Sequence, residues 1–178
     1  MEKKEKASKI ILILCIILFC FTLLQFIAPL ILENGTVTDL SGTVGVIDNK
    51  EYIKTMPFPI NFIYTAGDRL CHQKTERSFF INENQMPFCS RCTAIWIGMT
   101  IGIGILIFYS IPLDNRFIII AILSLVPIGI DGTGQLLGFW ESSHLSRLIT
   151  GLFVGIITGM ALGIIIDELK TLKKAKTS

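Results

Sequence analysis

Residues 10–32 read IILILCIILFCFTLLQFIAPLIL, an apolar run of 23 residues without a charged side chain. As an α-helix this run is roughly 34 Å long, which is enough to cross a hydrocarbon core of about 30 Å. Lysines precede the run, as they do in a signal peptide. The run is longer than the apolar region of a signal peptide, and no small-x-small cleavage sequence follows it. We therefore expect a retained transmembrane helix over residues 10–32.

Three further apolar runs follow, and they predict spans at about 93–111, 116–137 and 146–166. Across the chain 51% of the residues are hydrophobic and only 17% are charged, whereas a soluble domain has about a quarter. The lysines lie mainly at the two ends of the chain, which excludes a nucleic-acid binder built on a basic face. The predicted fold class is an all-α membrane protein, with four transmembrane helices and a Cys/His-containing extracytoplasmic loop.

The lysines predict the orientation of these spans in the cell membrane. They cluster in the tails at 1–9 and 167–178, and Arg116 lies in the short connection between the second and third spans. The positive-inside rule places these three segments, and both termini, in the cytoplasm. The long loop at 33–92 is then extracytoplasmic. Within it, residues 33–57 are expected to form either a hairpin or an irregular loop.

The long loop carries a cluster of metal-ligand residue types, namely Cys71, His72, Cys89 and Cys92. Three thiolates and one imidazole would complete a tetrahedral zinc site, and iron is a further candidate. Cys92 also stands at the start of a predicted helix, where the helix dipole favours a thiolate. The sequence therefore leaves three interpretations open: a metal site, a thiol–disulfide oxidoreductase using Cys89 and Cys92 with Cys71 as partner, and a structural disulfide. The other two cysteines, at 15 and 20, lie within the first span and receive no role.

A second polar cluster is predicted where the third span meets the fourth. Asp131 lies inside the third span, and Gln135 follows one helical turn later on the same face. Arg147 begins the fourth span, at a depth where it can pair with Asp131, and Glu141 lies in the turn. Asp131, Gln135, Glu141 and Arg147 are the candidates for a catalytic or binding pocket for a lipid or another anionic, phosphate-bearing substrate. A purely structural ion pair is the alternative.

Glycines recur every four residues along the fourth span, which is typical of a glycine zipper. Gly151, Gly155, Gly159 and Gly163 share one helix face that lets another backbone approach closely, for internal packing or for a homodimer. With four spans, the long loop and the connection between spans three and four lie on the same side. We therefore expect the Cys/His cluster and the second polar cluster to meet in one site.

Taken together, the motifs resemble one family. They are Cys71-His72-Gln73, Glu76-Arg77-Ser78, Pro87-x-Cys89-x-Arg91-Cys92-Thr93, Asp131-Gly132-x-x-Gln135, Glu141-Ser142, Arg147 and Gly151. This ordered set resembles the domain of unknown function 2085 family of small prokaryotic membrane proteins over about residues 60–165. Ala94 stands where the pattern has glycine. The resemblance implies that the motif residues form one unit, and it carries no activity.

The functional prediction is accordingly a membrane protein with a zinc site and a polar pocket. A thiol–disulfide oxidoreductase and a non-enzymatic assembly or scaffold protein are the alternatives, so the sequence does not decide whether the chain is an enzyme.

Overall fold

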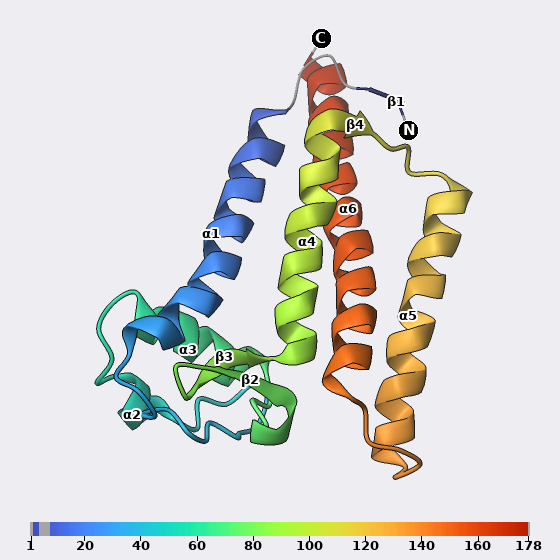
Figure 1. Cartoon of the computed structure of the whole chain (residues 1–178). Coiled ribbons are helices and arrows are strands. Elements are labelled where there is room, and N and C mark those ends of the chain that lie inside the picture. The colour runs from blue at the N-terminus through green and yellow to red at the C-terminus, as the bar shows by residue number, and fades with distance from the viewer. Residues whose placement is uncertain (1, 4–7, 178) are drawn as a thin grey trace. The chain divides into compact units, whose positions relative to one another are not determined.

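A computed structural model describes residues 2–3 and 8–177, with four long helices (Figure 1). Lys4 and Lys6 of the predicted basic tail lie outside the described residues. All four helices are long and apolar enough to cross a membrane, which confirms the predicted fold class. They are α1 (Lys9–Ile31), α4 (Ser90–Phe108), α5 (Asn115–Leu136) and α6 (His144–Thr177). Helix α6 continues past the predicted span end at residue 166, because the lysine-containing tail is also helical.

The chain forms two compact units, which are described separately below. Unit 1 comprises residues 1–19 and 94–178, and unit 2 comprises residues 20–93. The second half of α1 and the first turn of α4 therefore belong to unit 2 together with the long loop.

Unit 1 is a bundle of parts of all four long helices around an apolar core. Its buried core members come from every one of them: Ile11, Leu18, Ile103, Leu106, Phe117, Ile157 and Ile164. Many large apolar side chains point outward instead, including Ile13 and Ile122, which are 57% and 60% exposed. A soluble protein rarely exposes so much continuous apolar surface, whereas a membrane protein covers it with lipid.

Glycines let α4 and α6 pack in close contact within unit 1. A Cβ atom at Gly98 would clash with the carbonyl oxygen of Leu152, and one at Gly159 would clash with the backbone of Met99. Gly155 faces α4 in the same way. Part of the predicted glycine stripe thus serves packing inside the unit, and its use in a homodimer stays a prediction.

One end of unit 1 gathers segments that are distant in sequence. Strand β1 (Glu2–Lys3) pairs antiparallel with β4 (Tyr109–Ser110), which follows α4. The ammonium group of Lys170 in α6 donates a hydrogen bond to the hydroxyl of Ser8, at 3.1 Å. The N-terminal segment, the α4–α5 connection and the end of the α6 span therefore share one end, as four spans require. The assignment of that end to the cytoplasm stays a prediction.

Unit 2 contains secondary structure that the sequence patterns did not predict. Helix α3 (Ile60–Leu70) packs on a hairpin of β2 (Ser78–Ile81) and β3 (Asn84–Cys89), and α2 (Lys50–Ile53) and the short 3-10 helix η1 (Thr75–Arg77) complete it. The hairpin turns at Asn82 and Glu83, both with positive φ, which suits the right-handed twist of its strands. Apart from α2, residues 33–57 are irregular, so the loop alternative is confirmed over the hairpin.

Candidate functional site

Three cysteine side chains converge in unit 2, and we call them the thiol cluster. Cys71 follows α3, Cys89 ends β3, and Cys92 lies in the first turn of α4. Their Sγ atoms all lie within 4.8 Å of one another. Cys71 is buried, and Cys89 and Cys92 are partly buried. Three separate elements thus bring three soft donor atoms to one point.

A close approach between α3 and β3 positions two of these thiols. Gly67 of α3 lies directly against the carbonyl group of Pro87 in β3, and a Cβ atom at this position would clash with it. Cys71 directly follows the same helix and donates its backbone N–H to the carbonyl of Gly67, at 2.9 Å. The glycine therefore allows the end of α3 and the end of β3 to come together.

Backbone donors surround the sulfur atoms. The N–H groups of Gln73 and Cys89 each donate to Sγ of Cys71 at 3.4 Å. Hydrogen bonds from the thiols of Cys71 and Cys92, and then from the N–H groups that open α4, hold the pKa of Cys89 well below its usual value. The pKa of Cys71 is raised, first because its thiol donates to Cys89 and also because it is buried. The cluster therefore favours one thiolate stabilised by its neighbours.

His72, the fourth predicted ligand, is not brought into the thiol cluster. Its side chain is exposed, and Nδ1 lies 3.3 Å from the carbonyl oxygen of Gly42. Cys71 and His72 are adjacent in an extended stretch, where successive side chains point to opposite sides. The structure therefore gathers three of the four predicted ligands.

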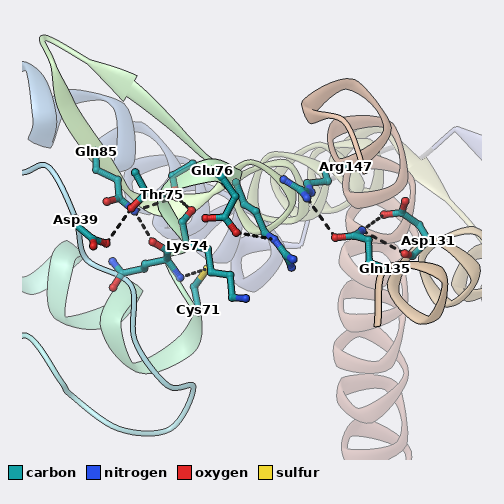
Figure 2. Close-up of polar contacts among 12 residues, drawn as sticks. Asp39, Cys71, Lys74, Thr75, Glu76, Gln85, Asp131, Gln135 and Arg147 are labelled. Carbon is teal, nitrogen blue, oxygen red and sulfur yellow. Dashed lines mark hydrogen bonds and ion pairs between the residues drawn. The ribbon is translucent and has the colours of Figure 1, made fainter. Parts of the chain in front are cut away.

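A buried hydrogen-bond network supports the loop that follows Cys71 (Figure 2). The amide nitrogen of Gln85 donates to the carbonyl of Gln73 and, at 3.1 Å, to the hydroxyl of Ser78, while its oxygen accepts from the N–H of Leu40 at 3.0 Å. Gln73 has φ +45°, and its side chain donates to the carbonyl of Pro87 at 2.7 Å. No sequence pattern indicated a role for Gln85, because its hydrogen bonds are made with residues that are distant in sequence.

Further hydrogen bonds attach the irregular segment at residues 33–57 to α3 and η1. Buried Asp68 accepts from the backbone N–H of Asn49 at 3.0 Å and from its side-chain amide at 2.9 Å. Asp39 accepts from the hydroxyl of Thr75 at 2.8 Å (Figure 2). Hydrogen bonds from Ser41, first from its backbone, together with the Thr75 bond lower the pKa of Asp39.

Unit 1 contains a second group of polar side chains, which we call the polar network. Gln135 donates to Oδ2 of Asp131 at 3.1 Å, and its oxygen accepts from Arg147 Nη2 at 3.2 Å (Figure 2). Ser142 donates to the same carboxylate oxygen at 2.9 Å and lies 2.6 Å from the hydroxyl of Ser146. Asp131, Arg147 and Ser142 are all buried. A bridging amide thus connects the two residues that the sequence analysis paired.

The polar network includes three of the four predicted pocket residues. Glu141 is exposed and has no hydrogen bond or ion pair among those found in the described residues. Ser142 and Ser146 join the network instead. Ser142 stands next to Glu141 in the motif given above, whereas Ser146 belongs to none of the motifs. A catalytic or substrate-binding role for this group stays a prediction, as does its meeting with the thiol cluster, which belongs to the other unit.

Comparisons with known proteins bear on the part of the chain that contains both groups. The family described as "Predicted membrane protein (DUF2085)" matches residues 71–165. An uncharacterised protein of Methanocaldococcus jannaschii is 38% identical over 99 residues, which are 52% of this chain and 61% of that protein. An uncharacterised protein of Methanothermobacter thermautotrophicus is 36% identical over 87 residues, which are 49% of this chain and 78% of that protein.

The match thus covers less than two thirds of the Methanocaldococcus relative. No solved structure was found to match the chain. The matched family segment begins at the first thiol, ends within α6, and spans more than half of the chain. The chain belongs to the DUF2085 family of predicted membrane proteins.

Proposed function

We propose that this membrane protein holds a zinc ion on the three thiolates of Cys71, Cys89 and Cys92. The observation that carries the proposal is the convergence of their Sγ atoms, all within 4.8 Å of one another. Thiolates around one tetrahedral zinc ion lie about 3.8 Å apart, given Zn–S bonds of about 2.3 Å. Only small side-chain adjustments separate the cluster from that arrangement.

The surroundings of the sulfur atoms support bound metal over free thiols. Hydrogen bonds from the neighbouring thiols hold the pKa of Cys89 well below its usual value, so this sulfur is the thiolate with which metal binding would begin. Cys71 accepts two backbone N–H groups, from Gln73 and Cys89, but its pKa is raised, so zinc would have to displace its proton. Because thiolates are soft ligands, they select zinc or iron over magnesium or calcium. Zinc is the proposed ion, because thiolates in a tetrahedral arrangement are the usual ligands of zinc sites in proteins.

Metal binding would fasten three elements of unit 2 together. Cys71 follows α3, Cys89 ends β3, and Cys92 begins α4. In this unit, residues 33–57 are irregular apart from α2, and they are held by hydrogen bonds such as those of Asp68 with Asn49. A metal that joins three elements would add to the stability of the unit, because its binding free energy becomes folding free energy. The role proposed for zinc is therefore to stabilise this unit.

Metal analysis of detergent-purified protein tests the proposal. The wild type is expected to retain about one zinc per chain, the stoichiometry of a single tetrahedral site. Cys71→Ser, Cys89→Ser and Cys92→Ser should each lose it. Cys20→Ser is the matched control, because Cys20 is exposed and lies outside the thiol cluster.

Thiol counting on the same samples separates the proposal from its rival. A thiol–disulfide oxidoreductase would retain no metal, and two of the three clustered thiols would disappear from the count on mild oxidation and return on reduction. That result would contradict the zinc proposal.

A further inference from the structure

We infer that the zinc ion of the thiol cluster has only three protein ligands and keeps its fourth position for an exchangeable external ligand. Water would occupy it at rest, and a small thiol could displace the water, binding as the thiolate while its proton passes to solvent. This inference rests on the proposed function, and it concerns what the site can bind beyond stabilising unit 2. In zinc proteins, four protein ligands make a closed structural site, while three leave a position for water or substrate.

The first argument comes from the ligand set. Among the residues that the structure describes, no fourth Cys, His, Asp or Glu side chain joins Cys71, Cys89 and Cys92. The nearest candidate in sequence is His72, and its ring contacts the carbonyl of Gly42 at 3.3 Å. The backbone N–H of Gly42 in turn donates to the carbonyl of His72 at 3.0 Å. His72 is therefore engaged with the loop on the side away from the thiols.

The second argument comes from unsatisfied polar atoms on residues that flank the thiols. Ser90 directly follows Cys89 and is fully buried, yet its hydroxyl has no hydrogen-bond partner in the described part of the chain. Gln73 follows Cys71 by two residues, and its buried Oε1 likewise has none there. Buried polar groups are almost always hydrogen-bonded, so two such atoms next to the thiols in sequence call for a partner. The O–H groups of a metal-bound water are the kind of donor that such atoms accept.

The third argument concerns the class of ligand that could displace the water. A zinc ion with three thiolates is a soft centre, and it favours another sulfur donor over a carboxylate. Three thiolates on Zn²⁺ leave a net charge of −1, which opposes a further anion. Cationic residues lie close to the ligands in sequence, with Arg69 and Lys74 on either side of Cys71 and Arg91 between Cys89 and Cys92, and we expect them to offset part of this charge. A small thiol is therefore the expected exchanging ligand.

Cobalt substitution tests the inference, because Co²⁺ takes tetrahedral zinc sites and its absorption reports the ligands. The protein is loaded with Co²⁺ in thiol-free buffer and titrated with 2-mercaptoethanol, while dialysis measures the metal that stays bound. The charge-transfer absorption is expected to rise saturably by about one third, from three cobalt–sulfur bonds to four. His72→Ala should change the zinc affinity by less than about tenfold, which is the least that loss of a ligand-orienting residue usually costs. His144→Ala, at the only other histidine, is the matched control.

Each outcome has one meaning. If the wild type retains no metal, the proposed function itself fails. If metal is retained but the thiol leaves the spectrum unchanged, the site is closed and the inference is wrong. If His72→Ala also lowers the affinity more than about tenfold, the fourth ligand is that histidine. A rise in absorption with retained metal and an unaffected His72→Ala variant supports the inference.

Discussion

Replacing Gly67 by alanine should weaken zinc binding although the residue is not a ligand. The new Cβ atom would clash with the carbonyl oxygen of Pro87 and lie 2.9 Å from the side-chain nitrogen of Gln73. Backbone atoms cannot rotate away, so α3 has to move from β3. Because Cys71 directly follows α3 and Cys89 ends β3, this movement separates two of the three thiols.

The size of the effect follows from the cost of overpacking, which is about 1–3 kcal/mol. The gain of alanine over glycine inside a helix is common to the metal-free and zinc-bound forms, so it cancels from the binding free energy. A cost of about 2 kcal/mol corresponds to roughly a 30-fold change in an equilibrium constant. The metal-free protein can relax by moving α3, whereas the zinc-bound form must restore the close approach, so the cost falls on binding.

Competition with a chromophoric chelator measures the affinity in detergent. Gly67→Ala is expected to bind zinc up to roughly 30-fold more weakly than the wild type. Gly129→Ala is the matched control, because that glycine also lies in a helix and a Cβ atom there would meet nothing within 4 Å. If Gly67→Ala binds zinc as tightly as the control, the close approach of α3 and β3 does not position the thiols, and the reasoning is wrong.

Two further predictions concern unit 1. Gln135→Leu removes the amide that connects Asp131 with Arg147 and should destabilise the protein by about 1–3 kcal/mol, seen as earlier thermal unfolding in detergent. A wild-type unfolding temperature would mean that the amide contributes nothing. Gly159→Leu should force α6 away from the backbone of Met99 and cost about 3 kcal/mol or more, again measured by thermal unfolding. Its zinc content should stay that of the wild type, since the thiol cluster belongs to the other unit; loss of zinc would contradict this.

The membrane spans could be predicted because hydropathy is a local property of the chain. Each of the four apolar runs became one long helix, and the ends differ by a few residues. The largest difference is at α6, which continues to Thr177. Charged residues end an apolar run without ending a helix, because lysine and glutamate are good helix formers.

The thiol cluster was partly predictable. Two cysteines separated by two residues lie within one turn, so Cys89 and Cys92 could be placed together from their spacing alone. The inclusion of Cys71 rested only on its residue type, because cysteine is a common metal ligand. His72 was included for the same reason, and its position depends on a contact with Gly42, 30 residues away in sequence.

The scaffold of unit 2 was beyond the reach of sequence patterns. Gly67 matters because of one backbone contact with β3, and Gln85 because its amide joins three segments. Neither residue has a recognisable spacing or motif. Long-range contacts of this kind decide the fold of an irregular segment, and they cannot be predicted from the patterns of a single sequence.

The polar network has a consequence for how the protein enters the membrane during synthesis. Asp131 and Arg147 each oppose insertion of its own helix, by less than the about 2.5–3.5 kcal/mol that a charge costs at a helix centre, because both lie near a helix end. The bond from Gln135 to Asp131 lies within α5, whereas the bonds from Arg147 to Gln135 and from Ser142 to Asp131 form only when α5 and the start of α6 are side by side. The two helices should therefore leave the translocation channel as a preformed hairpin, and α5 alone should be inserted poorly.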